Sequence, residues 1–200
     1  MAMTRFEKRF VNREKKAQRN VKKVEQYLQK LDVEKIHQVL ELGCGIGAVS
    51  AYLSNEYEME VYGTDFDPDQ IEIARSIYPQ NEKLQFGIED ASNLSCDDNN
   101  FDLVISQNVF HHIPNWRNAI REVQRVLKKD GTFIWDDLSF PKIVIEIFQP
   151  FVKNYGLYTF SDIEEELFEV EFEQIACKHF WHGFFPHHHL VVKKKTRLKT

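Results

Sequence analysis

Apolar and polar positions along this chain follow two patterns. Short apolar runs predict buried strands, of which the clearest are residues 36–42, 60–65, 84–88, 100–108 and 132–135. Elsewhere apolar residues recur every three or four positions, which predicts helices that bury one side, at residues 5–31, 69–77 and 115–129. Two further strand-like runs, 170–180 and 188–194, come after a capped helix that begins near Thr159. The alternation of strands and helices predicts an α/β fold.

The first predicted strand leads directly into a glycine-rich turn. Residues 39–47 read Val-Leu-Glu-Leu-Gly-Cys-Gly-Ile-Gly, and helix-compatible residues follow. Gly43, Gly45 and Gly47 allow positive φ and let the backbone approach a ligand with no Cβ in the way. The unpaired N–H groups at the start of the next helix would face the same ligand. The stretch therefore predicts a binding site at the end of the first strand.

The spacing of these glycines distinguishes between ligands. A dinucleotide fingerprint is G-x-G-x-x-G, whereas here the third glycine comes one residue early and Glu41 stands two residues before the first. This pattern resembles the first motif of the class I S-adenosylmethionine-dependent methyltransferases, and in particular their ubiquinone- and menaquinone-biosynthesis branch. In that family the loop surrounds the methionine and ribose parts of the cofactor. A dinucleotide-binding or purely structural loop is the alternative.

A second acid stands at the place that a ribose would require. Asp65 ends the second predicted strand, 18 residues after Gly47. In a right-handed βαβ unit the carboxyl end of this strand lies beside the glycine loop. A carboxylate there can accept hydrogen bonds from both ribose hydroxyls. The alternative role for Asp65 is to cap the helix that begins near Pro68, although Asp67 is the better candidate for that cap.

The resemblance covers roughly residues 36–194 and implies roles for further residues. In the family, an acid after the third strand accepts from the adenine amino group and the next residue's N–H meets the ring, which points to Asp90 and Ala91. Gln107, at the end of the fourth strand, would flank the cofactor. The segment from residue 101 to residue 113 resembles the F-D-x-V…H-H motif of the family's small-molecule branch.

The resemblance also implies an architecture. We expect a doubly wound, Rossmann-like, seven-stranded, mostly parallel sheet with an antiparallel last strand and an N-terminal helix. Residues 1–34 would form that basic amphipathic helix and residues 35–200 the class I methyltransferase domain. The helix either packs on the domain, covers the cofactor as a lid, or serves as an RNA-binding arm. Its apolar stripe consists of Phe10, Ala17, Val21, Val24, Leu28 and Leu31.

Composition and short motifs limit the partners. The net charge of −5 gives no general attraction to nucleic acid or acidic membranes, although residues 1–23 hold nine Lys and Arg against two Glu. Neither the N/D-P-P-Y-like tetrad nor the Pro-Cys pair of nucleic-acid methyltransferases occurs in the sequence, so we expect no nucleic-acid substrate. No apolar run approaches ~18 residues, so no membrane span is expected. Cys44, Cys96 and Cys177 form neither a zinc motif nor a disulfide framework, which favours a cytoplasmic location.

The expected reaction moves a methyl group from S-adenosyl-L-methionine to an O, N or C atom of a small-molecule acceptor by in-line displacement. S-adenosyl-L-homocysteine would be the product. Alignment alone can supply ~7–11 kcal/mol, so few catalytic residues are needed. His111 and His112 are the candidates for a base, with a structural role in their loop as the alternative.

The acceptor pocket is expected at the carboxyl ends of the strands. It would gather His111, His112, Asp136, Asp137, residues 138–160 and residues 181–185. Asp136 and Asp137 with one histidine could hold Mg²⁺, but the prediction is no metal. The histidines at 187–189 cannot all meet one ion, because neighbouring strand positions point to opposite faces.

Two functions of other classes remain open. One is a catalytically silent, methyltransferase-like regulatory or scaffold subunit. The other is an NAD-dependent oxidoreductase. The sequence names neither the acceptor nor the oligomeric state.

Overall fold

The computed structural model describes the backbone of residues 5–195 and the side chains of residues 15–195 other than His182. Phe10, from the predicted apolar stripe, lies outside the described side chains. The helices are α1 (Arg5–Leu28), α2 (Ala48–Tyr57), α3 (Pro68–Ile77), α4 (Trp116–Val126), α5 (Lys142–Phe148) and α6 (Phe160–Glu169), with 3-10 turns η1 (Val33–Lys35) and η2 (Phe110–His112). The strands are β1 (Gln38–Leu42), β2 (Glu60–Asp65), β3 (Leu84–Ile88), β4 (Phe101–Gln107), β5 (Leu127–Leu138), β6 (Phe172–His182) and β7 (Phe185–Lys194).

The strands form one seven-stranded sheet with the order β3-β2-β1-β4-β5-β7-β6. The pairs from β3 to β5 are parallel, whereas β7 runs antiparallel to both β5 and β6. The predicted fold is therefore confirmed, including the reversed last strand. The strand order changes direction between β1 and β4, and in such sheets ligands bind at the carboxyl ends of the strands beside that point.

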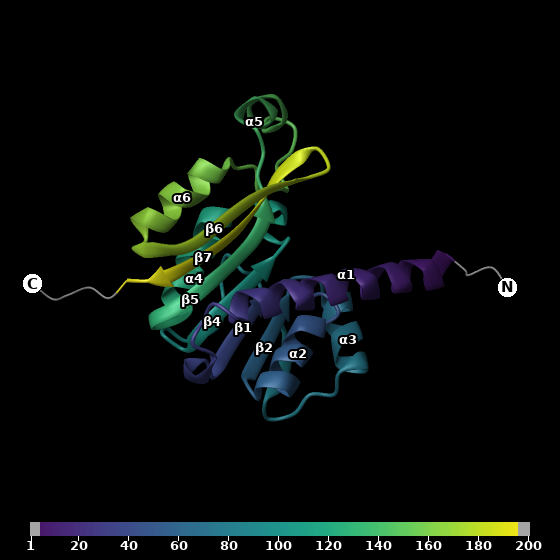
Figure 1. Cartoon of the computed structure of the whole chain (residues 1–200). Coiled ribbons are helices and arrows are strands. Elements are labelled where there is room, and N and C mark those ends of the chain that lie inside the picture. The colour runs from purple at the N-terminus through teal and green to yellow at the C-terminus, as the bar shows by residue number, and fades with distance from the viewer. Residues whose placement is uncertain (1–4, 196–200) are drawn as a thin grey trace, which may run out of the picture.

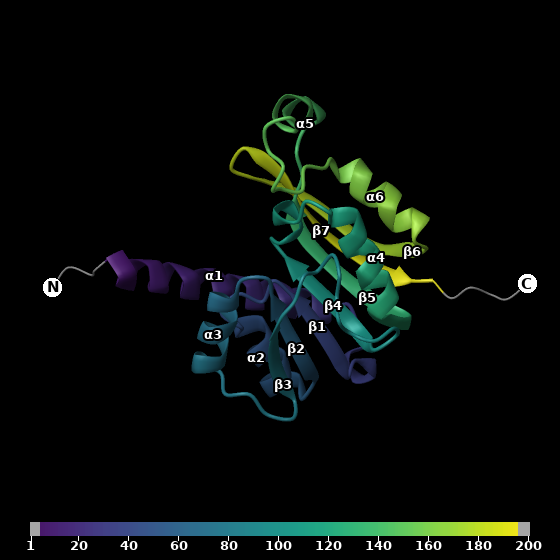
Figure 2. The same ribbon diagram turned by 180° about the vertical axis from the view of Figure 1, so that it is seen from behind.

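Helices cover both faces of the sheet (Figures 1 and 2). On one face, Val39, Ile105 and Ile134 share a core cluster with residues of α1, α2 and α3. On the other face, Leu40 and Trp135 share a second cluster with residues of α4 and α6. Because consecutive strand residues point to opposite faces, both must be apolar, which explains the nearly continuous apolar runs in the sequence.

The N-terminal helix is part of this core. Val24, Tyr27 and Leu28 of α1 are buried in the cluster that also holds Val39 and Val61. Figure 1 shows that α1 crosses the sheet and that its first turns extend beyond the body of the domain. No helix among residues 5–195 combines the length and the apolar character that crossing a bilayer would require.

The largest difference from the predicted boundaries lies between α4 and β5. The sequence pattern extends the helix after Asn115 to Lys129, but α4 ends at Val126 and residues 127–129 already belong to β5. Leu127 pairs with Phe101 of β4, and its carbonyl oxygen accepts from Lys194 Nζ at 2.6 Å. These contacts with distant residues extend the strand against the local helical pattern.

Candidate functional site

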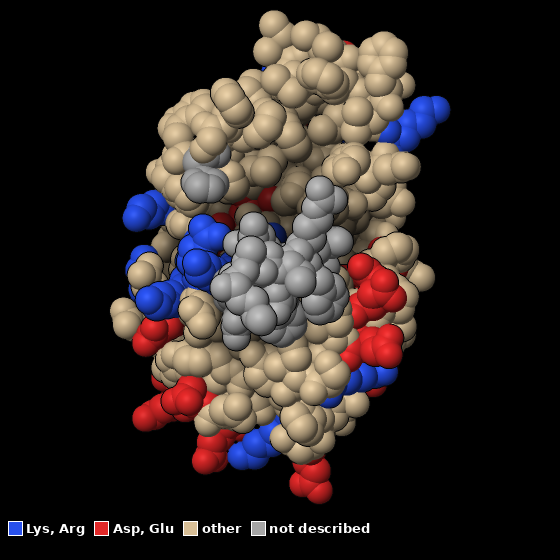
Figure 3. Space-filling model, turned by 90° about the vertical axis from the view of Figure 1, so that its right-hand side faces the viewer, with Lys and Arg blue, Asp and Glu red and all other residues tan. Residues whose placement is uncertain are grey.

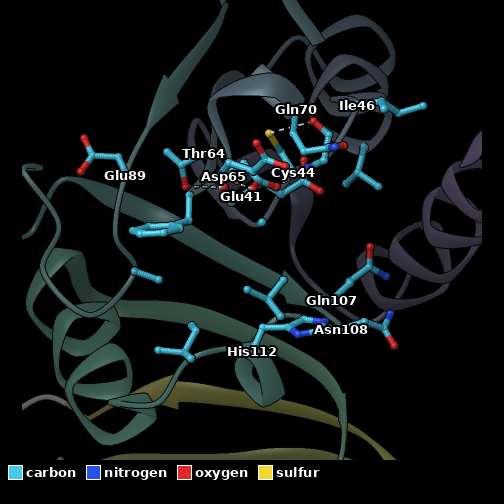
Figure 4. Close-up of a pocket in the computed structure, with 18 of the residues that line it drawn as sticks. Glu41, Cys44, Ile46, Thr64, Asp65, Gln70, Glu89, Gln107, Asn108 and His112 are labelled. Carbon is cyan, nitrogen blue, oxygen red and sulfur yellow. Dashed lines mark hydrogen bonds between the residues drawn. The ribbon is translucent and has the colours of Figure 1, made fainter. Parts of the chain in front are cut away.

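A cavity of about 760 Å³ opens at the carboxyl ends of β1, β2, β3 and β4, beside α1. Figure 4 shows Glu41 and Asp65 on one side of it and Gln107, Asn108 and His112 on the other. The predicted site residues that line it are Glu41, Gly43, Gly45, Asp65, Asp90, Ala91, Gln107 and His112. Gly47 and His111 are not part of the lining.

The glycine loop has the backbone that its sequence predicts. Gly43, Gly45 and Gly47 have φ values of +67°, +55° and +79°. A Cβ on Gly43 would lie 2.3 Å from Val109 Cγ2, and one on Gly47 would lie 2.7 Å from the Phe86 ring. Only a distant oxygen, at 3.9 Å, would meet a Cβ on Gly45. Gly43 and Gly47 therefore let the loop pack closely, while Gly45 leaves its open side to the cavity.

The Asp65 carboxylate points to this loop. Its Oδ2 accepts from the Gly45 N–H at 2.9 Å and its Oδ1 from the Asp67 N–H at 3.0 Å. The cap of α3 is Asp67, whose side chain accepts from the Asp69 N–H at 3.0 Å. Asp65 is thus held at the rim of the cavity by the loop and by the start of α3.

Glu41 lies below the loop and is buried. Its Oε2 accepts from Ser50 Oγ at 2.5 Å. Burial raises the pKa of Glu41 to about 7, although the Ser50 hydroxyl opposes the shift. A carboxyl group with such a pKa changes its charge near neutral pH, and a cation in the cavity would favour the ionised form.

The end of β3 contributes a tight turn to the cavity wall. Asp90 Oδ1 accepts from both the N–H and the hydroxyl of Ser92, at 2.8 and 2.7 Å. Ala91 lies between them and also lines the cavity. Phe66, directly after Asp65, lines the same side and is largely exposed. Phe66 was absent from the predicted site, although its position after the ribose candidate could have indicated it.

Gln107 connects the cavity to α1. Its Nε2 donates to the Asn20 carbonyl at 3.3 Å, while its buried Oε1 has no hydrogen-bond partner among the described residues. The cost of an unpaired buried acceptor is about 1–3 kcal/mol, so the site suits a ligand that donates there.

The helix α1 supplies lining residues that the sequence pattern did not single out. Lys16, Ala17 and Asn20 form one wall of the cavity. Asn20 lies four residues after Lys16 and three after Ala17, and these spacings place the three residues on one side of the helix. Ala17 was predicted only as part of the apolar stripe. The polar residues Lys16 and Asn20 beside it could have indicated that this part of the stripe faces a ligand site.

The two candidate histidines lie in different surroundings. His111 Nδ1 lies 2.5 Å from Oδ1 of the buried Asp137, whose Oδ2 accepts from the N–H groups of Val109 and Phe110. His112 lines the cavity, and burial, followed by the neighbouring His111, lowers its pKa. His111 thus holds the turn η2 in place, which leaves His112 as the histidine available to a ligand.

The prediction that these segments together form an aromatic acceptor pocket is wrong. Asp136 is fully buried outside the cavity, 2.9 Å from Lys23 Nζ and 3.0 Å from His189 Nδ1. Trp181 and Phe184 are exposed instead of lining a pocket. The antiparallel β6–β7 hairpin carries these two aromatic residues beyond the sheet, which the sequence pattern could not specify.

The candidate metal groups point apart. Asp136 faces α1, whereas Asp137 faces the turn η2 on the other side of β5. His188 Nε2 lies 2.8 Å from Ser139 Oγ, while His189 packs against Tyr27 of α1. Among residues with described side chains, no group of three His, Cys, Asp or Glu could hold an ion.

Comparison with known proteins finds methyltransferases that match about half of the chain. Residues 40–135 match the family model described as a methyltransferase domain. The chain is 34% identical over 99 residues to 2-methyl-6-phytyl-1,4-hydroquinone methyltransferase of Synechocystis, covering 50% of this chain and 31% of that protein. It is also 34% identical over 108 residues to the uncharacterized methyltransferase YcgJ of Bacillus subtilis, covering 53% of this chain and 42% of that protein.

Solved methyltransferase structures have the same fold. A SAM-dependent methyltransferase structure from Methanosarcina mazei superimposes with a TM-score of 0.67 at 18% identity, covering 82% of this chain and 94% of the other. The aligned stretches span less than half of the two curated relatives above. The resemblance to the class I methyltransferases is confirmed.

Proposed function

Residues 40–135 belong to the methyltransferase-domain family, and from this premise we propose that the protein is an S-adenosyl-L-methionine-dependent methyltransferase acting on a small-molecule acceptor. The observation that carries the proposal is the position of the Asp65 carboxylate, 2.9 Å from the Gly45 N–H at the rim of the cavity. A glycine loop and an acid on the adjoining strand, joined in this way, suit an adenosyl ribose.

The cavity fits the cofactor in three further respects. Gly45 leaves open space where a side chain would project. Buried Glu41 provides a carboxyl group suited to a positively charged ligand, and Gln107 offers a buried oxygen that no described residue pairs. We assign Asp65 to the ribose, Asp90 and Ala91 to the adenine, and Glu41, Gly43, Gly45 and Gln107 to the methionine end, with Gly47 shaping the loop.

The cofactor would supply a methyl group on a positively charged sulfur, which leaves as a neutral thioether. The chain's own contribution is alignment, since holding two reactants in line can supply ~7–11 kcal/mol. His112 is placed to accept a proton from the acceptor's O–H or N–H, and its lowered pKa keeps it neutral, and so able to do this, at pH 7.

The acceptor is proposed to be small and partly apolar. The wall on the His112 side includes Val109, Ile113 and Pro114. The Synechocystis relative is named for a hydroquinone with an apolar chain, which is consistent with this chemistry. We propose a cytoplasmic protein that modifies the O, N or C atom of such a molecule and does not act on nucleic acid.

Calorimetry with S-adenosyl-L-homocysteine tests the cofactor assignment. We expect binding by the wild type and a loss of at least about tenfold in affinity for Asp65→Ala, which removes two ribose contacts worth about 1 kcal/mol each. Asp69→Asn, an exposed acid outside the cavity, is the matched control and should bind as the wild type does. Undiminished binding by Asp65→Ala would overturn the assignment.

A screen with methyl-labelled cofactor separates the enzyme from a silent scaffold subunit. Phenols, amines and quinone precursors are the acceptors to offer. Cofactor binding together with labelled product supports the enzyme. Cofactor binding without product for any class would favour the regulatory or scaffold alternative.

A further inference from the structure

An apolar region projects from one end of the molecule. The helix α5 contains no buried residue, although its sequence is Lys-Ile-Val-Ile-Glu-Ile-Phe. In the turn after it, Phe151 is 83% exposed. The exposed apolar side chains of this segment are Ile143, Ile147, Phe148, Phe151 and Tyr155. We call these residues, together with Trp181 and Phe184, the apolar lobe.

The tip of the β6–β7 hairpin extends this lobe. Trp181 is 71% exposed and Phe184 is 92% exposed. The strand residues next to the hairpin turn are tied to the segment that leads into α5, because the Ser139 N–H donates to the Pro186 carbonyl at 3.0 Å. The rings of Phe140 and Phe185 also contact each other, with centroids 5.1 Å apart. Both ribbon views show α5 beside the hairpin tip.

A cluster of cations lies across the cavity from the apolar lobe. Lys15, Arg19 and Lys22 are exposed at spacings of four and three on α1, which places them on one side of the helix. No ion pair joins any of them to a described side chain. Figure 3 shows Lys and Arg gathered beside the grey residues, below a broad uncharged region.

The cavity lies between these two features. On one side, Lys16 and Asn20 line the cavity from α1, while Lys15, Arg19 and Lys22 lie on another side of the same helix segment. On the other side, Tyr155 of the apolar lobe contacts His112 of the cavity wall, with ring centroids 5.7 Å apart. The apolar lobe and the basic segment of α1 therefore border the cavity from two sides, and Figure 3 shows Lys and Arg together with a broad uncharged region on one face of the molecule.

We infer that this face docks on the surface of a bilayer that contains anionic lipids. Contiguous exposed apolar surface on a soluble domain marks an interaction site. Aromatic tips on a projecting helix and hairpin suit insertion at the headgroup boundary, where Trp, Tyr and Phe are favoured. The cluster of three cations across the cavity has no ion-pair partner among the described side chains and matches anionic headgroups. This attraction acts locally despite the net charge of −5.

A membrane fits these observations better than a protein partner does. The lobe is formed by two projecting segments, α5 with the turn after it and the tip of the β6–β7 hairpin, and its two most exposed side chains, Phe151 and Phe184, are aromatic. Given the proposed function, docking would bring the mouth of the cavity to the lipid surface. The acceptor class is then an amphiphile whose reactive head leaves the bilayer while its apolar tail stays in contact with it.

Vesicle co-sedimentation of the full chain, without cofactor, tests the docking independently of methyl transfer. The probes are vesicles of phosphatidylcholine alone and of phosphatidylcholine with phosphatidylglycerol. We expect partitioning onto the anionic vesicles that weakens with salt, and much less onto the neutral ones. Calorimetry with S-adenosyl-L-homocysteine, run beside it, shows whether the cofactor site is intact in each variant.

Two sets of variants separate the two contributions. Phe151→Ser combined with Phe184→Ser should lower the partition coefficient at least about tenfold, since each removes an exposed aromatic side chain that the bilayer would bury. Arg19→Glu combined with Lys22→Glu should lower it by more than about twentyfold and abolish most of the salt dependence. The matched controls are Phe168→Ser, 74% exposed on α6, and Lys129→Glu, at the opposite end of β5.

Three outcomes would overturn the inference. The first is no binding to anionic vesicles at low salt by a wild-type protein that still binds the cofactor product. The second is equal loss of binding in the control variants. The third is a concentration-dependent dimer that the Phe151 and Phe184 substitutions abolish, which would assign the lobe to a second copy of the chain.

Discussion

At the scale of single residues, Gly47 and Gly183 both have a positive φ but differ in the space around them. Gly47 has φ +79°, and an added Cβ would meet both the Phe86 ring and Ala74. Gly183, in the β6–β7 turn, has φ +67° but nothing within 4 Å of an added Cβ. The pair therefore separates backbone strain from overpacking.

Gly47→Ala should destabilise the protein by about 2–4 kcal/mol, from left-handed strain and a clash in the core. Gly183→Ala should cost only about 1 kcal/mol, because strain acts alone there. Urea unfolding monitored by circular dichroism measures both. Equal losses would show that Phe86 yields to the extra methyl group and that Gly47 is needed for its φ alone.

Glu41 predicts a pH dependence of cofactor binding. Its raised pKa of about 7 means that it is largely protonated below that pH and ionised above it. A cationic ligand favours the ionised form, so the affinity for S-adenosyl-L-methionine should rise up to about tenfold between pH 6 and pH 8. Calorimetry at both pH values measures this change.

Glu41→Gln is the informative variant, since its side chain cannot ionise. It should bind weakly at both pH values and show little change between them. Asp69→Asn should retain the wild-type profile. A profile that Glu41→Gln leaves intact would assign the pH dependence to another group, such as His112.

At the scale of elements, one ion pair fastens α1 to the sheet. Burial alone would raise the pKa of Asp136, but His189 and Lys23 hold it below its usual range. A carboxyl group whose pKa is lowered on folding stabilises the protein above its unfolded pKa, and this stabilisation is lost as the pH falls. The contribution is therefore complete at pH 7 and declines below about pH 4.

Lys23→Met should cost roughly 2–3 kcal/mol at pH 7, because it leaves the buried carboxylate with His189 alone. The difference from the wild type should shrink toward pH 3. Lys22→Met, one residue away and exposed, should change stability little. Urea unfolding at pH 7 and pH 3.5 tests the pair, and a loss that is the same at both would contradict the charge-based explanation.

The helices and strands also show how much of the secondary structure the sequence predicts. Strand β2 and strand β3 begin and end where the apolar runs predict, and Asp67 caps α3 as its position before Pro68 indicates. The end of α4 was wrong because Lys194 and Asp102, distant in sequence, draw residues 127–128 into β5. The local apolar pattern predicts buried strands well, but it contains no information on boundaries that contacts with distant residues determine.

The candidate site also has one part that the sequence predicts and another that it does not. The glycine loop and Asp65 were predictable, since spacing and strand order alone bring them together. The contribution of Lys16 and Asn20 from α1 was not, because their place depends on how a separate helix crosses the sheet. The prediction that residues 181–185 line the acceptor pocket was wrong for a related reason. A hairpin tip can extend past the sheet that it belongs to, and Trp181 and Phe184 are exposed there.

At the scale of the whole molecule, the cavity joins parts that are far apart in sequence. Its walls come from α1, from the glycine loop, from the ends of β2 and β3, and from the segment after β4. A ligand in it binds only the folded chain, so it should stabilise the entire domain by mass action. At a concentration of 100 times its dissociation constant, the gain is about 2.7 kcal/mol.

We therefore expect S-adenosyl-L-homocysteine at that concentration to raise the unfolding temperature by about 5–10 °C, given about 2–4 °C per kcal/mol for a domain of this size. Thermal unfolding followed by circular dichroism measures the shift, with Asp69→Asn as the fully responding control. Asp65→Ala should shift about half as far or less, because a tenfold weaker site still gains about 1.4 kcal/mol at the same ligand concentration. A shift that Asp65→Ala retains in full would place the ligand elsewhere. No shift in any protein would favour the silent-subunit alternative, because the glycine loop would then serve packing alone.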